Sequence, residues 1–267
     1  MKAKVSVVKV GGAVLEDVDK RKAFLQAFFS LATPKVLVHG GGRRATDVAA
    51  RLGVEAPMID GRRITSPEMM DIALMVYGGL VNKTLVAQLQ SYGIDALGLT
   101  GADLNVIAAH KRPVKTINYG LAGDIDQVNA EVLQAFLRKN QVPVMAPITH
   151  DGQGQLLNTN ADTIATAVAI ALSAEFEVSL ILSFEKKGVL EDAENDESVI
   201  PVLSSSDFAR GKIEGSIVGG MIPKLTNGFK ALEKGVQHVQ ITRYDHLTAR
   251  VILSMLMCVI IEVVYQI

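Results

Sequence analysis

Three charged residues, far apart in the chain, are of types that could act together on a phosphate group. Lys9 lies in an otherwise apolar run, with only Val10 between it and the pair Gly11 and Gly12. Lys224 is expected in the first turn of a helix, where its charge opposes the helix dipole unless an anion holds it there. Asp162 could fix the geometry of the two lysines if it faced inward between them. The plain alternative for each lysine is an exposed, solvated side chain.

Two glycine clusters each follow a β-rich run and precede a helical pattern. Gly11 and Gly12 follow residues 5–10, and three glycines at 40–42 follow residues 35–39. Backbone N–H groups at such turns can approach an anion closely, and the helix that follows adds partial positive charge. Neither GxGxxG nor GxxxxGK[ST] occurs, so neither a Rossmann dinucleotide site nor a Walker P-loop is indicated. One cluster alone could be a simple tight turn, whereas two adjacent clusters favour an anion site.

Two further segments carry polar side chains that suit a small anionic ligand. Arg63, within residues 61–65, offers a guanidinium that could bind a carboxylate through two hydrogen bonds. Asn160 is a good N-cap for an Ala-rich helix, and Asn158 lies just before it. The five histidines show no metal-ligand spacing, and no serine lies in a GxSxG motif. No metal site or hydrolase elbow is therefore expected, and His39 is interpreted as structural.

Composition excludes several classes of protein. The 267 residues include 27 Lys and Arg and 28 Asp and Glu, a net charge of −1, which argues against a nucleic-acid binder. Apolar residues make up 49% of the chain, too many for a disordered protein. The single cysteine, Cys258, cannot form an internal disulfide, so a cytoplasmic setting is expected. Few aromatic residues and many Val, Ile, Leu and Ala are typical of a buried parallel sheet.

The alternation of β-rich and helical patterns predicts an α/β fold. We expect an αβα sandwich with a mainly parallel central sheet, two lobes, and a hairpin flap in the N-terminal lobe. Strands are expected at residues 5–10, 35–39, 96–99, 142–146, 178–182 and 237–241, and helices at 19–31, 42–52, 67–92, 126–140, 160–172 and 223–232, with a further short helix starting at Ser206. Asp126 should cap its helix, residues 105–109 and 116–118 should form the flap, and Pro143 suggests an edge or a terminus for its strand.

A boundary between the two lobes is expected near residues 172–177. It divides the chain into an N-terminal lobe, residues 1–175, and a C-terminal lobe, residues 176–267. Residues 251–261 form an apolar run that is too short for a transmembrane helix and is interrupted at Glu262. We interpret this run as a buried strand or helix or a contact between protomers, and expect no membrane partner.

Five motifs in this order resemble those of the N-acetylglutamate kinases of the amino acid kinase superfamily. They are KVGG at 9–12, HGGG at 39–42, GRRIT at 61–65, NTNAD at 158–162 and GGMIPK at 219–224. The resemblance covers residues 1 to about 247. It implies transfer of the γ-phosphoryl group of ATP to the side-chain carboxylate of an N-acyl-L-glutamate, the second step of arginine biosynthesis. It also implies Mg²⁺ held mainly by the nucleotide phosphates, and a homodimer formed through the N-terminal lobe.

The resemblance assigns a role to each matching position. Lys9 and Lys224 match the lysines that stabilise the transferring phosphoryl group, and Asp162 matches the aspartate that orients them. The substrate-binding positions are Gly41, Gly42, Arg63 and Asn158, and the nucleotide-binding positions are Gly11, Gly12, Gly188 and Gly220. Because a carboxylate nucleophile is already ionised at neutral pH, no general base is needed. The reaction then requires alignment and neutralisation of charge, which lysines, N–H groups and Mg²⁺ provide.

The sequence departs from the family pattern in places and leaves alternatives open. Members commonly carry an aspartate-containing segment where this chain has residues 183–190, and the apolar run after Arg250 replaces a strand containing Gly-Thr. The chain begins at its first strand, so the extra N-terminal helix of arginine-inhibited members, and that inhibition, are not expected. The acyl group, acetyl or a larger one such as succinyl, is open. A kinase for carbamate, aspartate, glutamate or UMP, or a non-catalytic sensor, remains an alternative.

Overall fold

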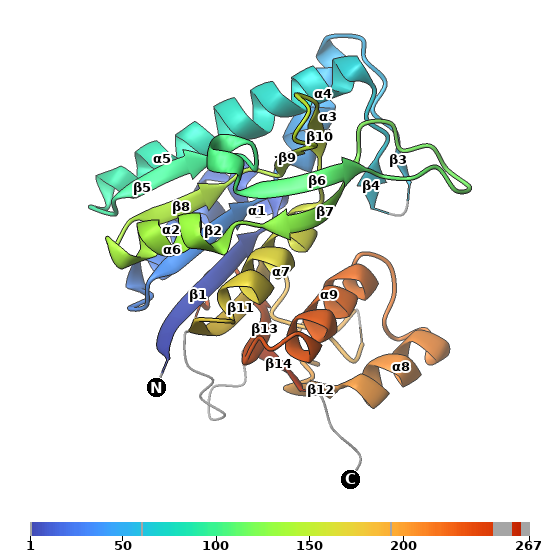
Figure 1. Ribbon diagram of the computed structural model, residues 1–267. Helices are drawn as coiled ribbons and strands as arrows, with labels where there is room; N and C mark the ends of the chain where they lie inside the picture. Colours follow the sequence, from blue (N-terminus) through green and yellow to red (C-terminus); the bar gives the residue numbers. More distant parts are fainter. Residues whose placement is uncertain (1, 60, 193, 248–257, 263–267) are drawn as a thin grey trace.

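The computed structural model describes residues 2–59, 61–192, 194–247 and 258–262, and its centre is an eight-stranded sheet (Figure 1). The strands are β1 (Ala3–Val10), β2 (Lys35–His39), β5 (Ala96–Leu99), β8 (Val142–Met145), β11 (Phe176–Phe184), β12 (Val202–Ser204), β13 (His238–Arg243) and β14 (Cys258–Glu262). Their order is β12-β14-β13-β11-β1-β2-β8-β5. From β13 to β5 the strands run parallel, and β14 is antiparallel to β13.

Helices cover both faces of this sheet. On one face lie α6 (Ala130–Arg138), α7 (Ala161–Leu172), α8 (Ser205–Glu214) and α9 (Met221–Glu233), and on the other α1 (Gly12–Glu16), α2 (Val18–Ser30) and α5 (Asn82–Ser91). A hydrophobic core lies on each face of the sheet, and strand β1 contributes to both. Val5 and Val7 pack in the core of the first face, and Val8 and Val10 in that of the second. A central strand buried on both sides is the reason for its continuous apolar sequence. The expected α/β sandwich with a mainly parallel sheet is confirmed.

A long helical segment crosses the N-terminal part of the molecule. It consists of α4 (Pro67–Ala73), the π-helical η1 (Leu74–Val81) and α5, and follows α3 (Gly42–Arg51) in the chain. The side chain of Ser66 accepts a hydrogen bond from the backbone of Met69 and caps the segment. Residues 67–91 are long and apolar enough, by length and composition alone, to cross a membrane, with mean hydropathy 1.3. In this fold, however, Met69, Met70 and Ile72 pack in a core with α3.

The flap is a second sheet beside the central one. It consists of β6 (Ile107–Lys111), β7 (Gly123–Val128), β9 (Ile148–His150) and β10 (Leu156–Asn158) in the order β10-β9-β6-β7, preceded by the short η2 (Asp103–Asn105). A separate ribbon joins β3 (Met58–Ile59) to β4 (Arg62–Arg63). The antiparallel pair β6–β7 confirms a hairpin here, but residues 116–118 do not contribute a strand to it.

One local expectation is wrong, and another holds only in part. Asp126 does not cap a helix, because it lies in β7 and accepts a hydrogen bond from Nδ1 of His110 across the hairpin at 2.6 Å. The helix begins at Ala130 instead, with Asn129 as its N-cap residue. Pro143 does not mark an edge, since β8 lies between β2 and β5. It does lie at a terminus, because it is the second residue of β8. The pairing of β8 with β2 begins only at Val144, so the missing N–H of the proline is tolerated.

The expected lobe boundary falls at the passage from α7 into β11, which is itself an inner strand. The sheet therefore runs continuously through both proposed lobes. In Figure 1, α8 and α9 (orange) lie at one end of the molecule and α4 and α5 at the other. Of the apolar run near the C-terminus, residues 258–262 form β14, paired with β13 and β12. Residues 251–257 lie outside the described residues.

Candidate active site

Two lysines and one aspartate meet at the carboxyl end of the central strand. Nζ of Lys9, in β1, lies 2.9 Å from Oδ1 of Asp162, in the first turn of α7. Nζ of Lys224, in α9, donates a hydrogen bond of 2.8 Å to Oδ2 of the same carboxylate. One carboxylate thus spaces two ammonium groups, the arrangement expected from the sequence.

Local structure explains why these side chains converge. Asn160 caps α7 by accepting hydrogen bonds from the backbone N–H groups of Asp162 and Thr163, which fixes the first turn of this helix. Alternate residues of β1 point to the same face of the sheet, so Lys9 lies on the face where Val5 and Val7 pack. Because α7 and α9 cover this same face, the sheet directs Lys9 toward both of them.

Burial makes the electrostatics of this cluster strong. The side chains of Lys9 and Asp162 are 8% and 10% exposed, so little water screens their charges. Burial lowers the pKa of Lys9, and Asp162 opposes that shift. Burial alone would raise the pKa of Asp162, but the charges of Lys9 and Lys224 outweigh it and hold that pKa well below its usual range. Asp162 therefore stays ionised and keeps both lysines in place.

The two glycine turns pack against each other beside this cluster. A Cβ on Gly12 would lie 3.1 Å from the backbone nitrogen of Gly41, and a Cβ on Gly40 would lie 3.0 Å from the nitrogen of Gly12. Side chains would therefore force the turns apart. Next to them is a cavity of about 220 Å³, lined by Lys9, Gly12, Gly40, Gly41, Gly42, Met58, Gly61, Arg62, Arg63, Tyr77, Ala122, Pro147, Asn158, Thr159, Asn160, Ala161 and Asp162.

Arg63 supports the second glycine turn as well as lining the cavity. Its Nη2 donates to the carbonyl of Gly42 at 2.8 Å and to Oγ1 of Thr46 at 2.9 Å, and its Nη1 donates to the carbonyl of Ala56 at 3.1 Å. Nε of Arg63 is buried without a hydrogen-bond partner. Two of the five N–H groups of the guanidinium, on Nε and Nη1, therefore have no partner among the described residues. Asn158 also lines the cavity, and its Nδ2 donates to Oγ1 of Thr65.

The predicted nucleotide positions lie apart from the cavity, except for Gly12. Gly11 is the N-cap residue of α1, and Gly220 is the N-cap residue of α9. Gly188 is buried in the segment after β11. Neither Gly188 nor Gly220 lines the cavity that holds the glycine turns. These positions remain predictions.

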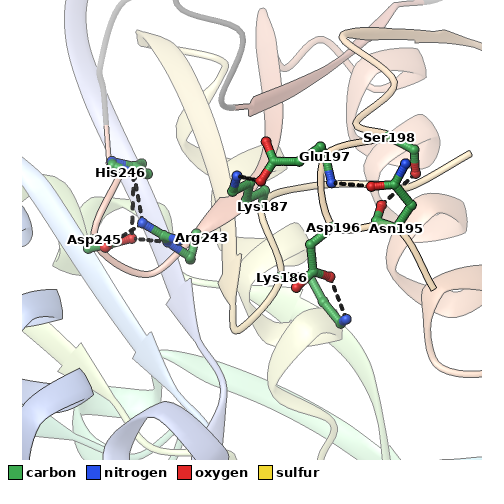
Figure 2. Close-up of polar contacts among 9 residues, drawn as sticks. All are labelled: Lys186, Lys187, Asn195, Asp196, Glu197, Ser198, Arg243, Asp245 and His246. Atoms are coloured by element: carbon green, nitrogen blue, oxygen red, sulfur yellow. Dashed lines mark hydrogen bonds and ion pairs between the residues drawn. The ribbon is translucent and has the colours of Figure 1, made fainter. Parts of the chain in front are cut away.

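Surface ion pairs organise the segment after β11, where the sequence departs from the family pattern. Figure 2 shows Lys186 paired with Asp196 at 2.6 Å and Lys187 paired with Glu197. Near them, Nε of Arg243 donates to Oδ1 of Asp245 at 2.6 Å, after the end of β13 (Figure 2). None of these paired residues lines the cavity.

Sequence reasoning missed Tyr77 and Met58 and gave no role to Arg62, all of which line the cavity. Tyr77 is 4% exposed, and its ring would lie 3.0 Å from a Cβ on Gly41. Its position in an apolar helical pattern is that of a core residue, so only the adjacent glycines could have marked it. Arg62 adjoins Arg63 in β4, and burial lowers its pKa. No hydrogen bond or ion pair joins its guanidinium to another described residue.

A family model described as the amino acid kinase family matches residues 4–243. The chain belongs to the amino acid kinase family. Among relatives within it, the acetylglutamate kinase of Bacteroides fragilis is 55% identical over 242 residues, covering 91% of this chain and 93% of the relative. That of Bacteroides thetaiotaomicron is 54% identical with 91% and 94% coverage, and that of Methanopyrus kandleri 38% identical with 91% and 96% coverage.

Solved structures show the same fold. The smu.665 protein of Streptococcus mutans superposes with a TM-score of 0.76 at 31% identity, covering 91% of this chain and 95% of that one. The N-acetylglutamate synthase of Neisseria gonorrhoeae, solved with coenzyme A and N-acetyl-glutamate, gives a TM-score of 0.72 at 22% identity. The match covers 92% of this chain and 55% of the synthase.

Proposed function

We propose that the protein is a cytoplasmic acetylglutamate kinase. It transfers the γ-phosphoryl group of ATP to the side-chain carboxylate of N-acetyl-L-glutamate, the second step of arginine biosynthesis. The observation that carries this proposal is the Lys9–Asp162–Lys224 cluster beside a cavity lined by glycines. The acetylglutamate kinases with 50–55% identity over nine-tenths of the chain support the choice of acceptor.

The parts of the site have distinct roles in this reaction. Lys9 and Lys224 neutralise charge that develops on the transferring phosphoryl group, and Asp162 holds their separation. The N–H groups of Gly41 and Gly42 face the same reacting oxygens, while the remaining N–H groups of Arg63 bind the α-carboxylate of the acceptor. Since the acceptor carboxylate is ionised at neutral pH, it attacks without a general base.

Mg²⁺ enters this site with the nucleotide phosphates. Among the described residues, no group of three His, Cys, Asp or Glu side chains is placed to hold a metal ion. Asp162, the acidic side chain of the cluster, has both oxygens engaged by Lys9 and Lys224. An ion carried mainly by the phosphates would fit this donor set, and it would supply shielding of the phosphate charge.

A coupled assay of ADP release tests the proposed function. The enzyme should turn over N-acetylglutamate with ATP and should leave carbamate, aspartate, free glutamate and UMP unphosphorylated. Turnover of one of these four compounds, and none of N-acetylglutamate, would assign the site to another member of the family. Binding of both ATP and acetylglutamate without any turnover would instead support a sensor.

A second acceptor, an N-acyl-glutamate with a carboxylate on its acyl chain, is favoured by Arg62. This half-buried guanidinium lines the cavity beside Arg63 without an ion-pair partner among the described residues. Succinyl would place a carboxylate where acetyl has a methyl group. Steady-state kinetics should show which acyl group has the higher kcat/KM. An Arg62→Leu variant that loses kcat/KM for N-succinylglutamate alone would assign Arg62 to this carboxylate.

The protein is also proposed to form a homodimer through the helical segment 67–91. Three large apolar side chains on this segment are exposed, Leu74 by 37%, Met75 by 55% and Leu80 by 48%. A second copy of the chain would cover them, as apolar patches of this kind mark interaction sites. Sedimentation should show a dimer, and Met75→Glu should shift it to monomer. A monomeric wild-type chain at micromolar concentration would contradict the proposal.

A further inference from the structure

One histidine of the second glycine turn is completely buried and has a partner on each ring nitrogen. His39 is 0% exposed and ends β2, next to Gly40. Its Nδ1 lies 2.9 Å from the carbonyl oxygen of Gly40. Because a carbonyl oxygen only accepts hydrogen bonds, Nδ1 carries the hydrogen and donates it.

Asn82, at the start of α5, completes this arrangement from the other side. Its Nδ2 lies 3.2 Å from Nε2 of His39 and also donates to the carbonyl of Val144 at 2.9 Å. An amide NH₂ group is a donor in both contacts, so Nε2 of His39 is the acceptor. Both contacts therefore select the same neutral ring, with its hydrogen on Nδ1. Burial lowers the pKa of His39 to about 4, so the ring stays neutral at physiological pH.

Asn82 fits in the core because the neighbouring strand has a glycine, with no side chain, beside it. Asn82 is 1% exposed and lies against Gly98 of β5. A Cβ at Gly98 would be 1.8 Å from Oδ1 of Asn82, so no other residue fits at this position without displacing the amide. Asn82 also lies directly after the π-helical turn, a feature frequent at functional sites.

The hydrogen bond from His39 has a geometric consequence for the cavity. A trans peptide is planar, and its C=O and N–H point in opposite directions. When Nδ1 of His39 holds the carbonyl of Gly40, the N–H of Gly41 in the same peptide must point away from the imidazole. Gly41 lines the cavity, and its N–H has no hydrogen-bond partner among the described residues. Glycines on both sides of this peptide would otherwise let it rotate.

We infer that His39 and Asn82 are positioning residues, which hold the Gly40–Gly41 peptide so that the N–H of Gly41 donates to the oxygens of the transferring phosphoryl group. This inference rests on the proposed kinase function. Neither side chain touches the substrate, and both act through one peptide plane. The chain of contacts runs from Asn82 to His39, then to the carbonyl of Gly40 and the N–H of Gly41.

Four variants test the inference through the separation of kcat from KM. His39→Leu and Asn82→Leu remove the two contacts, and Gly98→Ala displaces Asn82 from outside the cavity. Each should lower kcat by about 10-fold or more while KM for N-acetylglutamate changes by less than about 3-fold, as expected for a misplaced donor to the transition state. His39→Asn should restore most of kcat, because its Nδ2 can donate from about the position of Nδ1.

A transition-state analogue and a matched control separate positioning from general damage. Affinity for ADP with aluminium fluoride and N-acetylglutamate should fall in parallel with kcat, while affinity for N-acetylglutamate alone stays constant. Leu89→Ala creates a cavity in the same helix, at a fully buried side chain away from the turns, and should leave kcat unchanged. Unchanged kcat in both His39→Leu and Asn82→Leu would overturn the inference. An equal loss of affinity for N-acetylglutamate and for the transition-state analogue would overturn it too.

The tautomer itself provides a test that does not depend on activity. Nitrogen-15 NMR of the histidine-labelled wild-type protein should show Nδ1–H for His39, and Nε2–H would overturn the inference even if every variant failed to fold. A wild-type protein that turned over no N-acylglutamate would instead contradict the proposed function. The two failures are therefore distinguishable.

Discussion

The two sides of the site are built in different ways. On the acceptor side, buried groups hold the glycine turns: His39 is 0% exposed, Asn82 1% and Arg63 6%. On the side proposed to bind the nucleotide, the segment after β11 carries surface pairs such as Lys186–Asp196, whose side chains are 50% and 61% exposed (Figure 2). Buried polar groups held by hydrogen bonds are constrained to one geometry, whereas exposed ion pairs contribute little in water.

This difference shows which part of the site is preorganised before its ligands bind. The acceptor cavity already has its donors in place, so little reorganisation is needed when the acceptor binds. The exposed pairs on the side proposed to bind the nucleotide give no such fixed geometry. Asp162 connects the two, because it binds Lys9 from the central strand and Lys224 from α9.

Removal of either lysine should have the largest effect. Lys9→Ala and Lys224→Ala should each lower kcat by about 100-fold, the usual cost of a positioned electrostatic group at a charged transition state. Initial rates with saturating ATP and N-acetylglutamate measure this loss. Lys224→Arg, which keeps the charge, is the control and should lose less than Lys224→Ala. If both alanine variants kept kcat within a factor of two, the mechanism would be wrong.

Loss of Arg63 should affect the acceptor side alone. In Arg63→Ala, KM for N-acetylglutamate should rise by about 10-fold or more, because a charge-assisted hydrogen bond to the acceptor carboxylate is lost. KM for ATP should stay constant. Arg62→Ala, on the same strand, is the matched control. With N-acetylglutamate as acceptor, it should change neither KM for the acceptor nor KM for ATP strongly. A parallel rise in both KM values would show that the two sides are not separate.

Much of this arrangement could be read from the sequence because single residues dictate it. Glycines at 11, 12 and 40–42 mark the turns, where Gly12, Gly40 and Gly41 leave no room for a Cβ, and Asn160 marks the start of α7. The position of Lys9 in an apolar strand, and of Lys224 against the helix dipole, pointed to an anion before any geometry was known.

What the sequence could not show depends on contacts between distant segments. Gly98 looks like an ordinary weak position in a strand, and only the packing of Asn82 explains it. Asp126 resembled a helix cap because its partner, His110, lies across a hairpin that periodicity does not reveal. Pro143 suggested an edge because register, which determines whether its missing N–H matters, is a property of the assembled sheet.

The buried histidine should make the acceptor side sensitive to acid. The folded-state pKa of His39 is about 4, below the value of 6.5 in the unfolded chain, so folding favours the neutral ring. The unfolded state therefore binds more protons between these values, and stability is complete above pH 6.5 and falls as pH drops toward 4. The shift corresponds to about 3 kcal/mol across this window.

Urea unfolding between pH 7 and pH 4 measures this effect. The free energy of unfolding of the wild-type protein should fall more steeply with acid than that of His39→Asn, which has no ring to protonate. Leu89→Ala is the control, since it destabilises the buried core without removing a titratable group and should leave the slope unchanged. Equal slopes for the wild-type protein and His39→Asn would contradict the buried, neutral ring.

The smallest effects should come from the surface pairs of the nucleotide side. Lys186→Ala and Lys187→Ala each break one pair shown in Figure 2, with Asp196 and Glu197 respectively. Because water and salt screen such charges, the midpoint of thermal unfolding should stay within experimental error, and KM for ATP should change by no more than about 2-fold. Differential scanning fluorimetry and kinetics at two salt concentrations measure both. If either variant raised KM for ATP as strongly as Arg63→Ala raises KM for the acceptor, these pairs would hold a preformed nucleotide site. The two sides of the site would then be equally ordered before binding.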